Sequence, residues 1–134
     1  MGVFDMITGI YASILALLFL CLFIGVVSKR LKYKIGIGDG NNHALSKAIR
    51  VHANFAEHVP YALLMMLLCE LTGISIYFVH AFGVTLVTAR LMHAYGLTRT
   101  SQNSWGRSIG IIATYVVIVM AAILLLLRHA LAYI

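Results

Sequence analysis

Charged residues are scarce in this sequence, and acidic residues are the scarcest. Asp, Glu, Lys and Arg make up 10% of its 134 residues, and only four of them are acidic. A soluble domain carries roughly 25% charged residues. The chain is instead 62% apolar, with a mean hydropathy of +0.97. We therefore exclude a water-soluble domain, because so short a chain has too little polar surface to face water, and expect lipid as its solvent.

Cysteine and proline are also rare. Cys21 and Cys69 lie inside apolar runs, without CxxC spacing or paired histidines, which argues against a disulfide framework or a metal site. We interpret both cysteines as packing residues. The single proline, Pro60, removes a hydrogen bond within a helical run, and we expect a kink there that widens a pocket.

Four apolar runs are long enough to cross a bilayer, which takes about 20 residues. They predict an all-α fold with helices at about 6–28, 44–71, 74–96 and 105–130, in one domain covering residues 1–134. Short connections between such helices give a four-helix up-down bundle in the membrane. Small residues are expected to let helix backbones approach closely, at Gly83, Ala89, Ala94, Gly96, Gly106 and Gly110. The first run lacks a basic leading segment and a cleavage site, so we do not expect a cleaved signal peptide.

Basic residues gather on one side of the predicted spans. They lie in or beside the first and third connections: Lys29, Arg30, Lys32, Lys34, Lys47, Arg99 and Arg107. On the other side stands Arg128 alone. Because basic loops stay in the cytoplasm, we expect both termini on the non-cytoplasmic side. The net charge of +6 therefore reflects basic loops on one side of the membrane and not a surface that binds nucleic acid. We expect no nucleic-acid partner.

Glycines are concentrated in the first connection, at about residues 31–42. A phosphate-binding glycine loop needs a preceding strand, whereas a predicted membrane helix precedes this one. We predict a flexible cytoplasmic loop that ends with Asn42 as the N-cap of the second helix.

Polar side chains interrupt the last three helices near their cytoplasmic ends. They are Arg50, His52, Asn54, Glu57 and His58 on the second helix, Arg90 and His93 on the third, and Arg107 and Ser108 on the fourth. Offsets of four and seven residues place Arg50, Asn54 and Glu57 on one helical face. The alternating directions of the helices bring all three groups to a similar depth.

The arginines outnumber the acidic residue in this cluster. An ionised side chain in a bilayer costs at least about 2.5–3.5 kcal/mol on insertion scales, so such residues usually face the interior and mark function. Three arginines and one glutamate leave two positive charges in excess, which favours a site for an anionic ligand entering from the cytoplasm. From the residues alone a structural network stays open, in which Glu57 pairs with Arg50 or Arg90 and the other arginines extend to the surface.

The segment from Arg50 to Pro60 resembles the MAPEG family, the membrane-associated proteins in eicosanoid and glutathione metabolism. The family's second helix carries Arg-x-x-x-Asn-x-x-Glu followed by a proline, and all four elements are present here. Similar positions elsewhere are Arg30, Arg90, His93, Arg107 and Ser108. The resemblance covers all four helices, and the run Gly38-Asp39-Gly40 is most like the bacterial branch.

This resemblance implies a homotrimer in a bacterial inner membrane, with glutathione as co-substrate between subunits near the cytoplasmic side. The implied activity is that of a transferase or peroxidase acting on hydrophobic electrophiles by thiolate attack, without a metal. Arg107 would favour the thiolate, arginines would bind the carboxylates, and Glu57 would bind the amine. The residues expected to bind glutathione are Arg30, Arg50, His52, Asn54, Glu57, His58, Arg90, His93 and Ser108.

One position departs from the family pattern. Its enzymes usually carry a tyrosine seven residues after the arginine of the third helix, and here Leu97 stands at that position. This departure makes a protein that binds without catalysis credible, and two other functions stay open. One is a non-catalytic membrane protein that binds glutathione or lipid, and the other is a small proton-coupled transporter with Glu57 as its titrating group.

Overall fold

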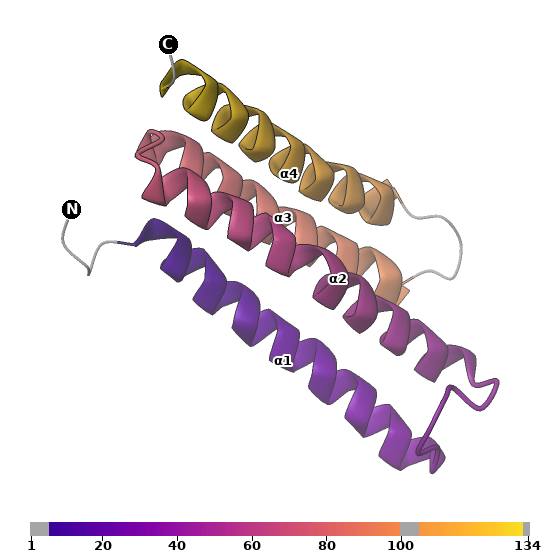
Figure 1. Ribbon diagram of the computed structural model, residues 1–134. Coiled ribbons are helices and arrows are strands. Elements are labelled where there is room, and N and C mark those ends of the chain that lie inside the picture. The colour runs from indigo at the N-terminus through magenta and orange to yellow at the C-terminus, as the bar shows by residue number, and fades with distance from the viewer. Residues whose placement is uncertain (1–5, 100–104, 133–134) are drawn as a thin grey trace.

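The protein is an all-α membrane bundle, as the sequence predicts. The structure is a computed structural model that describes residues 6–99 and 105–132, with the side chains of 6–95 and 105–131. Its helices are α1 (Ile7–Tyr33), α2 (His43–Leu71), α3 (Ile76–Arg99) and α4 (Trp105–Ala132). Figure 1 shows them side by side in alternating directions, so that α1 begins and α4 ends at the same end of the bundle.

The first helix extends five residues beyond its predicted end. It continues through the basic residues after Ser28 and stops at Lys34, which adopts the left-handed conformation with φ of 56°. The backbone N–H of Lys34 donates to the carbonyl of Leu31, and that of Ile35 donates to the carbonyl of Arg30, so that the end of the helix is satisfied. In the loop that follows, Asp39 accepts hydrogen bonds from the backbone N–H of Asn41 and from the side chain of Ser46 in α2. These bonds hold the pKa of its carboxyl below the usual value.

The predicted N-cap of α2 is confirmed. The Asn42 side chain accepts a hydrogen bond of 3.0 Å from the backbone N–H of Leu45. This bond satisfies one of the donors that the first turn of a helix leaves without a partner. The cap fixes where α2 begins and therefore the depth of the polar residues that follow.

Among the described helices, α1, α3 and α4 are long and apolar enough to cross a membrane. The second helix is less apolar because its first half carries the polar cluster. Its 29 residues nevertheless extend about 43 Å at the usual helical rise, which exceeds the hydrocarbon thickness of a bilayer.

The centre of the bundle is formed by α2 and α3, with α1 and α4 on the flanks. Both flanking helices pack on α2 and α3, and within the described residues they make no contact with each other. The core along α2 repeats at spacings of three and four residues: Val51, Phe55, Val59, Ala62, Met66 and Cys69. This spacing is one face of a helix, and it leaves the face with Arg50 and Glu57 exposed.

Two glycines let helices approach closely, as predicted. A Cβ on Gly110 would lie 2.5 Å from the carbonyl oxygen of Ala89, so α4 rests directly on the backbone of α3. A Cβ on Gly83 would overlap the ring of Tyr11, so α3 is equally close to α1. Both contacts require the absence of a side chain.

A buried carboxylate holds the start of α1 at the end of the bundle opposite the polar cluster. Glu70, near the end of α2, is 3% exposed and accepts hydrogen bonds from the backbone N–H groups of Ile7 at 2.6 Å and Thr8 at 2.9 Å. A carboxylate at a helix N-terminus also interacts favourably with the helix dipole. Glu70 therefore ties α1 to the α2–α3 hairpin. In a second contact at this end, the Tyr11 hydroxyl lies 2.9 Å from Nδ1 of His80.

Replacing Gly110 with alanine is expected to lower the free energy of unfolding by about 1–3 kcal/mol, because α3 and α4 must separate to admit a methyl group. Thermal unfolding in detergent measures the change. Gly25→Ala is the matched control, since a Cβ there meets nothing within 4 Å. That control should hold or raise stability, because alanine favours helix by about 1 kcal/mol over glycine. Equal losses for the two variants would contradict the close approach.

Glu70→Gln is expected to destabilise the bundle by about 2 kcal/mol, because it removes a charge-assisted acceptor from two backbone donors. Amide hydrogen exchange resolves the effect by position. Exchange should accelerate in the first turn of α1 and stay unchanged in the first turn of α2. Uniform acceleration, or none in α1, would show that Glu70 does not hold α1.

Candidate functional site

Arg90 is buried inside the membrane span of α3. It is 1% exposed, and its guanidinium donates from Nη1 to Oδ1 of Asn54 and from Nε to Oγ1 of Thr114, both at 3.0 Å. Its Nη2 also donates to Thr114. Thr114 in turn donates to the carbonyl of Gly110, which leaves its oxygen free to accept from the arginine. One cation thus joins α2, α3 and α4 through neutral acceptors.

Glu57 is not part of the Arg90 hydrogen-bond set. It lies with Arg50 and Tyr61 on the exposed face of α2. Arg50 and Glu57 are two turns apart on that face, about 10 Å along the helix. The acceptor from α2 is Asn54, one turn before the carboxylate. Both charges of the exposed face remain available to a ligand or a second chain.

His58 connects α2 to α4. Its Nδ1 lies 2.7 Å from the backbone carbonyl of Asn54, and its Nε2 lies 2.7 Å from the hydroxyl of Tyr115. The two rings meet edge to face, with centroids 5.3 Å apart. Tyr115 is not among the site residues that the sequence predicts. The available signal was a tyrosine next to Thr114 in an otherwise apolar run, but helical spacing alone does not show which residue of α2 it meets.

His93 joins α3 to the first turn of α4. It is 3% exposed, and its Nδ1 lies 3.2 Å from the carbonyl oxygen of Arg107. A carbonyl only accepts, so Nδ1 carries the hydrogen and Nε2 is an acceptor. That Nε2 is buried without a hydrogen-bond partner among the described residues. Arg107 itself is partly buried, and Ser108 beside it is exposed.

Two residues expected to bind glutathione are engaged with other groups. The ring of His52 turns toward α1 and lies 4.7 Å from the ring of Phe19, centroid to centroid. The Nη1 of Arg30 points into the α1–α2 loop, where it donates to the carbonyls of Ile35, Gly36 and Gly38 at 3.3, 3.2 and 2.9 Å. Arg30 thereby organises the glycine-rich loop. The side chain of Leu97 lies outside the described residues.

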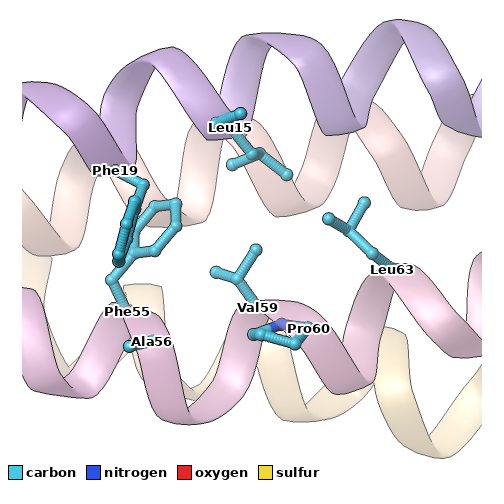
Figure 2. Close-up of a pocket in the computed structure, with 8 residues that line it drawn as sticks. Leu15, Phe19, Phe55, Ala56, Val59, Pro60 and Leu63 are labelled. Carbon is cyan, nitrogen blue, oxygen red and sulfur yellow. The ribbon is translucent and has the colours of Figure 1, made fainter.

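An apolar pocket of about 330 Å³ lies between α1 and α2, beside Pro60. Figure 2 shows Phe19 and Phe55 together at one end of it and Leu63 at the other. Its walls also include Leu15, Ala16, Ala56, Val59 and Pro60. Ala56 and Pro60 are exposed, so the pocket opens on the protein surface within the span of α2. The size and lining suit an apolar molecule.

The electrostatic balance of the site is positive. Three arginines, Arg50, Arg90 and Arg107, and a single carboxylate, Glu57, lie in the first halves of α2 and α4, near the middle of α2 and in the second half of α3. Within the described residues no three His, Cys, Asp or Glu side chains come together as metal ligands. The arrangement therefore suits an anionic organic ligand with polar groups that histidine and tyrosine can bind.

Comparison with known proteins identifies the family of the chain. Residues 8–127 match the MAPEG family. The inner membrane protein YecN of Escherichia coli is 38% identical over 110 residues, in strain K12 and in strain O6:H1, and the matched segment covers 82% of this chain and 82% of each relative. No solved structure matches the chain significantly. The family match spans all four helices and the polar cluster between them, so the chain belongs to the MAPEG family, the membrane proteins of eicosanoid and glutathione metabolism.

Proposed function

We propose that the protein is a glutathione-dependent membrane transferase or peroxidase. The observation that carries this proposal is the positive excess of Arg50, Arg90 and Arg107 over Glu57 toward one end of a MAPEG-family bundle. Glutathione is an anionic tripeptide with two carboxylates, an amine and a thiol. Arginines bind carboxylates with paired hydrogen bonds, and Glu57 on the same exposed face offers a partner for the amine.

The chemistry is attack by the glutathione thiolate on a hydrophobic electrophile. A thiol with a pKa of about 8.5 is mostly protonated at neutral pH, and a nearby cation favours its ionised form. Arg107 is our candidate for that cation, because it lies in the first turn of α4 beside the buried His93. The pocket between α1 and α2 supports an apolar co-substrate that arrives through the lipid.

The active form in this proposal is a homotrimer in a bacterial inner membrane, with the termini in the periplasm and the site open to the cytoplasm. Arg50 and Glu57 support the oligomer, since both are exposed on one chain within a helix that crosses the bilayer. Exposure of such charges to acyl chains is unfavourable. A neighbouring subunit and a bound anion would cover both.

A non-catalytic binding protein is the second candidate. Arg90 donates its hydrogen bonds to Asn54 and Thr114, and Arg30 donates to loop carbonyls of the same chain. This observation favours weaker ligand contacts than the family motif implies. A proton-coupled transporter has less support, because the arginines and Glu57 gather toward one end of the bundle.

Arg107→Ala tests the proposed function. Glutathione should raise the melting temperature of the detergent-purified wild type, produce thiolate absorbance and support turnover of chlorodinitrobenzene. The variant should lose the absorbance and most of the turnover. Arg128→Ala is the matched control, since Arg128 lies at the opposite end of the same helix and donates to the carbonyl of Thr72. Binding without turnover on a broad electrophile panel would select the binding protein, and no binding at all would reject both candidates.

Arg50→Ala is expected to weaken glutathione binding about 10- to 100-fold, because a charge-assisted hydrogen bond contributes roughly 1.5–3 kcal/mol. Isothermal titration with glutathione and with its ethyl ester at the glycine carboxylate identifies the contact. If Arg50 binds that carboxylate, the variant and the ester should each lose affinity, and their combination should lose little more. Independent, additive losses would place Arg50 elsewhere on the ligand.

A further inference from the structure

We propose that His58 and Tyr115 form a proton-transfer pair that takes the proton of the glutathione thiol and returns it to an oxygen of the electrophile. This inference rests on the proposed function and adds two residues and a substrate class to it. The substrates that such a pair favours are unsaturated aldehydes and ketones. In these compounds, attack at carbon drives negative charge onto an oxygen that then needs a proton.

The contacts of His58 determine where its hydrogen lies. The backbone carbonyl of Asn54, 2.7 Å from Nδ1, can only accept, so Nδ1 carries the hydrogen of the neutral ring. Nε2 then has a lone pair, and the Tyr115 hydroxyl 2.7 Å away donates to it. The phenol oxygen therefore keeps its own lone pairs for another donor, such as a thiol.

Asn54 of α2 ties the pair to the buried Arg90. Arg90 is held by Asn54, whose backbone carbonyl also orients His58, so one residue positions both groups.

The Tyr115 side chain is accessible, whereas its partners are covered. It is 48% exposed, while His58 is partly buried and Arg90 is 1% exposed. Tyr115 follows Arg107 by eight residues on α4, a rise of about 12 Å. The long Arg107 side chain can extend along α4 toward Tyr115 and close part of this distance. A glutathione sulfur between the two side chains can therefore meet the Arg107 cation on one side and the Tyr115 hydroxyl on the other.

Each proton is accounted for in the proposed cycle. The thiol proton passes to the Tyr115 oxygen as the tyrosine proton passes to Nε2 of His58, which leaves a thiolate and an imidazolium. The sulfur then bonds to the β-carbon of the unsaturated aldehyde, and the carbon–carbon π electrons move toward the carbonyl oxygen. Tyr115 protonates that oxygen, and the proton on His58 returns to Tyr115. The product enol becomes the saturated aldehyde, and no group leaves.

Halide displacement does not need the second half of this cycle. In chlorodinitrobenzene the sulfur bonds to a ring carbon and chloride leaves with its electron pair, so no oxygen is protonated. At about pH 9, above the ordinary thiol pKa of about 8.5, the thiolate also forms without the pair. The two substrates therefore separate proton return from thiolate attack.

The test compares Tyr115→Phe and wild type at about pH 9, as full-length detergent-purified protein, with glutathione and either nonenal or chlorodinitrobenzene. The variant should slow nonenal addition about 100-fold, the usual lower range for a general acid, and slow displacement much less. The ratio of the two rates is measured in one preparation, so partial misfolding does not change it. Tyr77→Phe is the matched control, because Tyr77 is 80% exposed near the far end of α3, and its ratio should equal that of the wild type.

His58→Phe tests the second member, since phenylalanine keeps the ring packing but removes both nitrogens. It should lower the rate ratio in the same direction as Tyr115→Phe. A structural tie between α2 and α4 would slow both reactions equally in either variant, and this result, or an unchanged ratio, overturns the inference while the proposed function stands. If the wild type conjugates neither substrate, the proposed function fails, and the inference fails with it.

Discussion

The guanidinium of Arg90 is the constraint on which the rest of the site depends. An arginine within a membrane span is costly unless it is enclosed and supplied with acceptors. Arg90 meets this demand with Asn54 from α2 and Thr114 from α4, and Gly110 allows α4 to approach closely enough. Loss of Asn54, Thr114 or the close approach at Gly110 would expose the Arg90 charge or leave it buried without a hydrogen-bond acceptor. The polar network therefore sets the relative depth of three helices, and it does so at the proposed site.

The acceptors of Arg90 are neutral, and this has an electrostatic consequence. A carboxylate partner would have cancelled its charge, whereas an amide and a hydroxyl leave it in place. The field of Arg90 then acts on whatever lies nearby in a medium of low dielectric, where such effects are strongest. A bound anion would be stabilised by this field. Glu57 stays on the exposed face of α2, free to recognise a ligand amine.

Structural and chemical tasks fall on different parts of the bundle. At one end, Glu70 caps the start of α1, and Tyr11 contacts His80 across to α3. Nearer the middle of the bundle, the ring of Phe19 packs against His52 and Phe55, and an apolar pocket opens between α1 and α2. The polar contacts that attach α1 are therefore not part of the pocket lining. This separation leaves the wall of the pocket apolar, as a site for a lipid-soluble molecule requires.

The sequence by itself determined the membrane environment, the four helices, the Asn42 cap, the close-packing glycines and the gathering of polar residues at one end. These features follow from composition, from the 3.6-residue period and from local capping, all of which act within a few residues. Only the tertiary structure decided the partners: Arg90 with Asn54 and Thr114, His58 with Tyr115, His52 against α1 and Arg30 in its loop. Helical spacing gives the face on which a residue lies. It does not give the rotation of that face toward a neighbouring helix, which is set by the packing of side chains from distant parts of the chain.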